Sequence, residues 1–113
     1  MSDQCIFCKI VMGEIPSAHV LDHERVIAIR DVIPQAPSHI LVLPRSHVPG
    51  LAELPASDSL WNELLAAVQE IVKAEGLEQG FRVVVNQGED GGQTVPHLHL
   101  HVLGRRPLTW PPG

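Results

Sequence analysis

The stretch that decides the fold is "VPHLHLHVLG", residues 95–104, in which apolar residues and histidines alternate. A period of two is typical of a β-strand, whose successive side chains point to opposite faces. One face is apolar and is predicted to point into the core: Leu98, Leu100 and Val102. The other face carries three histidines, about 7 Å apart: His97, His99 and His101. Three histidines in register indicate a functional site rather than an ordinary polar face.

The segments around this strand, itself expected at residues 97–103, predict an α+β domain. Four more strands are expected, the first two forming a hairpin: residues 18–23, 25–31, 39–44 and 81–87. A short helix is expected in residues 5–13 and a long amphipathic one in residues 58–75. Ser57 or Asp58 can cap the long helix, and Gly76 can end it. Because full helical crossovers between strands are missing, we expect an antiparallel five-stranded sheet with the long helix on one face.

Length and composition fit one domain, residues 1–113, with enough apolar residues (44%) for a core. The formal net charge of −5 and the scattered basic residues argue against a partner that is a nucleic acid. No apolar run approaches the ~20 residues of a membrane span, and the first residues do not resemble a secretory signal. We therefore expect a cytoplasmic protein that does not bind membranes, whose two cysteines are thiols or metal ligands.

Two kinds of chemistry fit the three histidines. Neutral imidazole is a good metal ligand, and it is also a nucleophile and an acid–base group near neutral pH. The preceding loop, "NQGEDGGQT" at residues 86–94, is rich in glycine, which lets backbone N–H groups approach a phosphate closely. The hydroxyl of Thr94 can donate to the same phosphate. Next to three histidines, this loop favours a phosphate site over an ordinary hairpin.

The motif at residues 97–103 resembles the signature of the histidine-triad superfamily, in which three histidines alternate with apolar residues. Three longer segments resemble its Hint branch, the purine nucleoside phosphoramidases: "DVIPQAPSHILVLPRSH" at 31–47, "VVVNQGEDGGQTVPHLHLHVLGRR" at 83–106 and "WPPG" at 110–113. The resemblance covers nearly the whole chain in family order. It implies hydrolysis or nucleotidyl transfer at an α-phosphate, with a purine nucleotide as the ligand.

The resemblance also implies a role for individual residues. His99 matches the nucleophile that forms a nucleotidyl-histidine, His101 the histidine that binds phosphate oxygens, and His39 the one that assists proton transfer. The other matching residues bind the nucleotide: Asp31 at the ribose, Val32 at the base, and Asn86, Gly92 and Thr94 at the phosphate. Relatives form homodimers with one continuous sheet, in which a residue like Trp110 reaches the partner's site. Thr94 stands where relatives usually have serine, and Pro96 removes a backbone donor before the triad.

Cys5 and Cys8 form a C-x2-C pair, a spacing that lets both sulfurs face one ion. A pair alone is half a site, and free thiols or a redox role stay open. Bacterial histidine-triad proteins that look similar here bind Zn²⁺ with such a pair and two histidines, which match His47 and His97. Four ligands close a tetrahedral site, so this zinc is expected to be structural, and no catalytic cofactor is expected.

Other readings stay open at this point. A dinucleoside polyphosphate hydrolase is possible within the same superfamily. A catalytic metal held by all three triad histidines predicts that chelation abolishes activity while the fold survives. A nucleotide-binding regulator with little turnover predicts binding of AMP without release of product.

Overall fold

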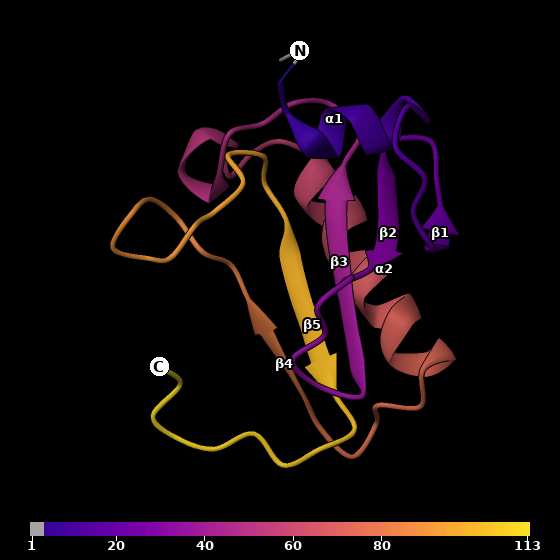
Figure 1. Cartoon of the computed structure of the whole chain (residues 1–113), viewed down its shortest axis with the longest axis vertical. Coiled ribbons are helices and arrows are strands. Elements are labelled where there is room, and N and C mark those ends of the chain that lie inside the picture. The colour runs from indigo at the N-terminus through magenta and orange to yellow at the C-terminus, as the bar shows by residue number, and fades with distance from the viewer. Residues whose placement is uncertain (1–3) are drawn as a thin grey trace.

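The computed structural model describes residues 4–113 and contains one five-stranded antiparallel sheet with the strand order β1-β2-β3-β5-β4 (Figure 1). The strands are β1 (His19–Asp22), β2 (Val26–Arg30), β3 (Ser38–Pro44), β4 (Phe81–Val84) and β5 (Leu100–Gly104). The helices are α1 (Ile6–Val11), α2 (Leu60–Ala74) and a short 3-10 helix, η1 (Leu51–Glu53). The predicted α+β class, the antiparallel sheet and the two helices are confirmed. None of the helices within residues 4–113 has the length and apolarity needed to cross a membrane.

The centre of the sheet is β3, which is buried along its whole length between β2 and β5. Its antiparallel pairing places His39 opposite Leu103 and Leu41 opposite His101. Directly paired residues of an antiparallel ladder point to the same face. The register therefore brings His39 and His101, which are 62 residues apart in the chain, to one face of the sheet.

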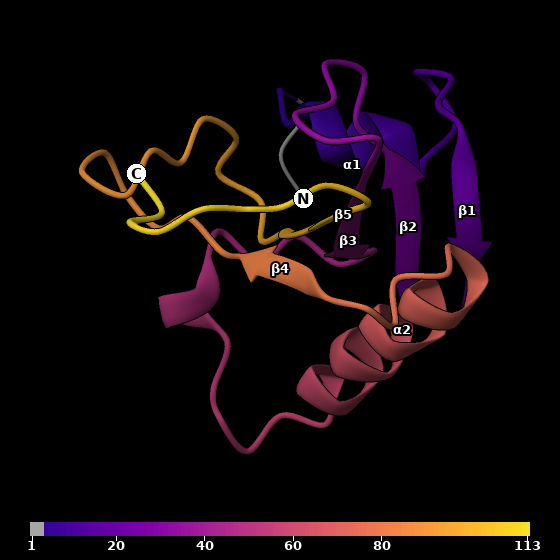
Figure 2. The ribbon, with the colours of Figure 1, turned by 90° about the horizontal axis from the view of Figure 1, so that it is seen from below.

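Helix α2 covers the opposite face of the sheet (Figure 2). Its apolar stripe packs there with the three residues that the alternation predicted to be core, Leu98, Leu100 and Val102. Gly76 has a φ of +67° and follows the end of the helix, as predicted. The residue at the N-cap position is Ser59, not Ser57 or Asp58, but the Asp58 carboxylate accepts a hydrogen bond from the Leu60 N–H at 2.8 Å.

The face that carries the histidines is covered by α1, which lies across it on the side away from α2 (Figure 2). A second apolar cluster fills the space between α1 and the sheet, with members from both: Cys5, Phe7, Cys8, Ile10, Ile27, Ile29, Leu41 and Leu43. The sheet is therefore a middle layer with apolar packing on both faces. His97 and His99 are buried beside Phe7 of α1.

Four of the five predicted strands are shorter in the structure, β1 and β2 by one residue at each end. β4 ends at Val84 rather than at residue 87, and β5 begins at Leu100 rather than at residue 97. Residues 95–97 form a bend instead, in which the His97 N–H donates to the Val95 carbonyl at 2.8 Å and the Leu98 N–H donates to Val48. Pro96 explains the late start, because proline has no N–H for the ladder. His97 and His99 thus precede the regular strand.

Candidate functional site

A chain of polar side chains lies on the histidine face of the sheet. The Nε2 of His39 and the Nδ1 of His101 are 2.9 Å apart, and an oxygen of Asp31 lies 3.4 Å from the same Nε2. On the other side of the ring, the backbone N–H of Gln35 donates to the Nδ1 of His39 at 3.0 Å. These contacts come from two strands and from the loop between β2 and β3.

The Gln35 amide decides where the protons of this chain lie. A ring nitrogen that accepts a hydrogen bond carries no proton, so neutral His39 must be protonated at Nε2. That Nε2–H then donates to the Nδ1 of His101, which leaves the proton of a neutral His101 on its own Nε2. Both histidines therefore have their proton on Nε2. His39 donates to His101, and the Nε2–H of His101 is the donor at the end of the network.

Burial keeps these histidines neutral. Desolvation lowers the pKa of His39, His99 and His101, and for His101 the nearby His99 and His39 lower the pKa further, to about 4. The carboxylate of Asp31 raises each pKa, but less than burial lowers it. Neutral imidazoles are the forms that act as nucleophiles and as hydrogen-bond relays near neutral pH.

His99 lies beside this relay, and its ring is held in a defined tautomer. Its Nδ1–H donates to the backbone carbonyl of His97 at 2.7 Å, so its Nε2 keeps a free lone pair. Its ring centroid lies 5.0 Å from that of His101, and 6% of the residue is exposed. A buried, neutral imidazole with one nitrogen fixed and the other unprotonated is suited to nucleophilic attack.

The other residues predicted to bind a nucleotide lie in loops and in the tail. Val32 is 90% exposed, next to Asp31, whose second oxygen accepts from the Ile33 N–H. The Asn86 side chain donates to the Gly92 carbonyl and so closes the glycine-rich loop. Among residues 4–113, no hydrogen bond links that loop to His99 or His101, although its last residue, Thr94, lines a cavity with Cys5 and His47. Trp110 is 82% exposed in the tail.

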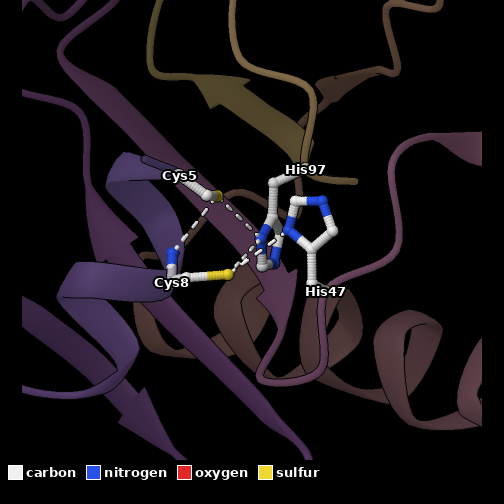
Figure 3. A group of neighbouring side chains, drawn as sticks. All are labelled: Cys5, Cys8, His47 and His97. Carbon is white, nitrogen blue, oxygen red and sulfur yellow. Dashed lines mark hydrogen bonds between the residues drawn. The ribbon is translucent and has the colours of Figure 1, made fainter. Parts of the chain in front are cut away.

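A second group of donors, which we call the four-donor cluster, consists of Cys5, Cys8, His47 and His97 (Figure 3). The Sγ of Cys5 lies 3.3 Å from the Nδ1 of His97, and the Sγ of Cys8 lies 3.3 Å from the Nδ1 of His47. The distance from the Cys8 sulfur to His97 is 3.6 Å. Both cysteines are buried, and neither forms a disulfide within residues 4–113. The four predicted metal ligands are thus brought together from α1, from the loop after β3 and from the bend before β5.

The spacing of the four-donor cluster fits a tetrahedral ion. Zn–S and Zn–N bonds of ordinary length at a tetrahedral angle place sulfur and nitrogen about 3.5 Å apart. The Nε2–H of His97 donates to the Pro44 carbonyl at 2.8 Å, which leaves its Nδ1 as the ligand atom, and the Cys8 N–H donates to the Cys5 sulfur at 3.3 Å. Such outer hydrogen bonds commonly orient metal ligands.

This geometry separates His97 from the other two triad histidines. One nitrogen of the His97 ring faces the cysteines and the other faces Pro44. In the part of the chain that the structure describes, the other group with metal-ligand spacing is Asp31, His39 and His101, without His97 or His99. The arrangement therefore disfavours a single catalytic ion held by all three triad histidines.

Two contacts around His99 and His39 were not predicted. Phe7 packs edge-on against His97 and His99, and the Gln35 amide fixes the tautomer of His39. Two features of the sequence could have indicated these contacts. Phe7 lies between two cysteines, and Gln35 lies between two prolines. A further cavity, about 630 Å³, lies between the α2–β4 loop and the tail, and none of the predicted site residues lines it.

The chain is similar in sequence and in fold to known proteins. The HIT domain model matches residues 12–108. A 14 kDa zinc-binding protein from Zea mays is 46% identical over 111 residues, 96% of this chain and 87% of that protein. The crystal structure of a HIT family hydrolase from Legionella pneumophila Philadelphia 1 superposes with a TM-score of 0.94 at 45% identity, over 97% of this chain and 100% of the other. A histidine triad nucleotide-binding protein from Candida albicans gives 0.86 at 30% identity, over 93% and 77%. The chain belongs to the HIT domain family.

Proposed function

We propose that this chain is a nucleoside phosphoramidase of the Hint branch that acts on purine nucleotides, with His99 as its nucleophile. The observation that carries the proposal is the ordered set of neutral imidazoles. The Nδ1–H of His99 is held by a carbonyl, so its Nε2 presents a lone pair beside the free Nε2–H of His101. The hydrolase and nucleotide-binding relatives support a reaction on a nucleotide.

In the proposed reaction, the Nε2 of His99 attacks the α-phosphorus, and the P–N bond breaks. The relay of His101 and His39 takes up one proton from water and passes one on to the leaving nitrogen, which departs as a neutral amine, so that both rings end neutral. Before this transfer, the Nε2–H of His101 donates to a phosphate oxygen. The His99 imidazolium that forms keeps its Nδ1–H on the His97 carbonyl. Water then cleaves the nucleotidyl-histidine, gives up a proton that the relay returns to the solvent, and releases the nucleoside monophosphate.

For the nucleotide, we propose that Asp31 binds the ribose hydroxyls and that the exposed Val32 packs against the base. Asn86, the Gly92 backbone and Thr94 are assigned to the phosphate side. The resemblance to the Hint branch supports these roles. Asp31 has a further contact that is consistent with a place beside the reaction, since its carboxylate lies 3.4 Å from His39.

We propose that the four-donor cluster binds Zn²⁺ and that this zinc is structural. Its distances, its buried thiols and the zinc-binding relative from Zea mays support this assignment. Bound zinc would cross-link α1 to the sheet, because its four ligands come from three separate segments. Two cysteines that form no disulfide within residues 4–113 are also consistent with the reducing cytoplasm, in which we place the protein.

We propose that two copies pair into a homodimer with one continuous sheet. Strand β4 is at one edge of the sheet and exposes Phe81 (45%) and Val83 (39%). An exposed apolar edge strand is prone to pair with another chain. The tail that carries Trp110 runs out past β4 (Figure 1), toward the place where a second copy would lie.

The test is hydrolysis of adenosine 5′-phosphoramidate by the purified protein, by His99→Asn and by metal-free protein, with circular dichroism alongside. We expect turnover by the wild type, almost none by His99→Asn, and retained AMP binding by both. Faster cleavage of dinucleoside polyphosphates would identify the alternative hydrolase, and AMP binding without turnover would identify a regulator. Metal-free protein that stays folded should still form nucleotidyl-histidine. Complete loss of that intermediate, restored only by zinc, would mean that the metal is catalytic.

A further inference from the structure

We infer that Phe7 is a positioning residue for His99, and that a metal in the four-donor cluster holds Phe7 and the His97 carbonyl in place. The cluster then does more than stabilise the fold, because it sets the orientation of the nucleophile. This inference rests on the proposed function for the role of His99, but the contacts that carry it are independent of any substrate.

The first contact is the Phe7 ring. It is 7% exposed and meets the His99 ring edge-on, with 5.0 Å between centroids and 80° between planes. It meets the His97 ring in the same way, at 5.8 Å and 83°. Edge-to-face pairs of this kind are favourable beyond the area they bury. Rotation of the His99 ring would break this contact, so Phe7 restricts the ring to one orientation.

The second contact is the His97 carbonyl, which accepts the Nδ1–H of His99 at 2.7 Å. Its position depends on how residue 97 is fixed. The ring of His97 is buried (0% exposed), with one nitrogen on the cysteines and the other on the Pro44 carbonyl. The same residue therefore serves the metal with its side chain and orients the nucleophile with its backbone.

Both contacts are tied to the four-donor cluster. His97 is a member of it, and Phe7 lies in the sequence between its two cysteines, Cys5 and Cys8. Helix α1 has only six residues, a length at which a helix is not stable by itself. Its hold on the sheet depends on tertiary contacts, and a metal bound by the four-donor cluster would add a cross-link to its apolar packing.

A specific consequence follows for catalysis. Loss of the contact with Phe7 or with the His97 carbonyl lets the His99 ring change orientation. Neither loss removes a group that we assign to nucleotide binding. The chemical step should slow while the affinity for AMP stays nearly constant, since a misplaced reacting group lowers the rate far more than it lowers binding.

The experiment compares Phe7→Leu with Ile10→Val, which changes an equally buried side chain (7% exposed) on the same helix. For Phe7→Leu we expect the single-turnover rate of nucleotidyl-histidine formation to fall about tenfold or more. Zinc content and AMP affinity should match those of the wild type, and Ile10→Val should keep the rate. Equal rates for Phe7→Leu and Ile10→Val would overturn the inference.

Metal-free wild-type protein provides a second arm, which also covers the case in which Phe7→Leu does not fold. We expect a rate lowered about tenfold but not abolished, restored equally by Zn²⁺ and by Co²⁺ because the metal only positions. In ¹⁵N spectra of the histidine rings, loaded protein should show His99 in a single tautomer, with the proton on Nδ1, and metal-free protein should show a mixture. An unchanged His99 signal on metal removal overturns the inference. A wild type with no turnover but with this spectral change refutes the proposed function alone.

Discussion

Replacement of Gln35 by proline tests the hydrogen bond that orders the proposed proton relay. The Gln35 N–H donates to the Nδ1 of His39 at 3.0 Å, and proline has no N–H. Among described residues other than glycine, only Arg105 has a positive φ, so the backbone at position 35 does not exclude proline on the sign of φ. Gln35→Ala is the matched control, because it keeps the N–H and removes only the side chain that donates to the Ile33 carbonyl.

The expected fall in kcat can be estimated from the hydrogen bond that the Gln35 N–H donates to His39. Loss of a hydrogen bond to a buried group costs about 1–3 kcal/mol. Here that free energy separates the two tautomers of His39, of which only the one with a proton on Nε2 can donate to His101. If the reaction uses this tautomer, kcat of Gln35→Pro should fall roughly five- to hundredfold. KM should change little, because the Gln35 amide faces His39 and not the nucleotide.

The assay is steady-state hydrolysis of adenosine 5′-phosphoramidate, with ¹⁵N spectra of the His39 ring. We expect Gln35→Ala to retain kcat and a single His39 tautomer, and Gln35→Pro to lose both. A folded Gln35→Pro protein with the kcat of the wild type would refute the direction that we assign to the relay. A mixed tautomer with unchanged kcat would show that His39 does not pass a proton in the slow step.

Three further predictions concern stability and metal. Leu64→Ala, at a fully buried position of α2, should lower the free energy of unfolding by about 2–5 kcal/mol in urea titrations, and an undiminished value would contradict the assigned core. Because the pKa of His101 is lowered to about 4 in the fold, the unfolded chain binds more protons below pH 6.5, and the stability due to His101 should be lost as pH falls from 6.5 toward 4. The loss in the free energy of unfolding is about 3 kcal/mol and should be absent in His101→Gln. If the wild type and His101→Gln showed the same pH dependence of stability, this prediction would be wrong. Cys8→Ser should lower zinc content measured by mass spectrometry and destabilise the fold, and full zinc content would exclude Cys8 as a ligand.

The alternation in residues 95–104 was sufficient to predict which side chains of this segment enter the core. Leu98, Leu100 and Val102 pack under α2, as predicted, because burial of every second residue is a local property of a strand. The predicted start of the strand was wrong by three residues. Pro96 was visible in the sequence, but the bend at 95–97 also depends on the hydrogen bond from the Leu98 N–H to Val48, which is far away in the chain.

Local sequence patterns did not predict the contacts between residues that are far apart in the chain. Helix α1 has too few residues to show a helical period, so its packing on the histidine face was not predicted. The contact between His39 and His101 depends on the register of β3 against β5, which local patterns do not specify. The grouping of His47 and His97 with the cysteines came from family resemblance alone, and the geometry now agrees with it.

The bend before β5 also explains how adjacent histidines in one motif can serve two separate chemistries. If the strand began at residue 97, the His97 and His99 rings would lie side by side on one flat face and would compete for one ligand. The bend instead turns the His97 ring toward α1 and the Pro44 carbonyl, while its own carbonyl meets the Nδ1 of His99. Pro96, which precedes the regular strand, therefore helps to separate the proposed metal ligand, His97, from the proposed nucleophile, His99. A chain with a regular strand at residues 95–97 would have the same three histidines, but their side chains would not be divided between two separate sites.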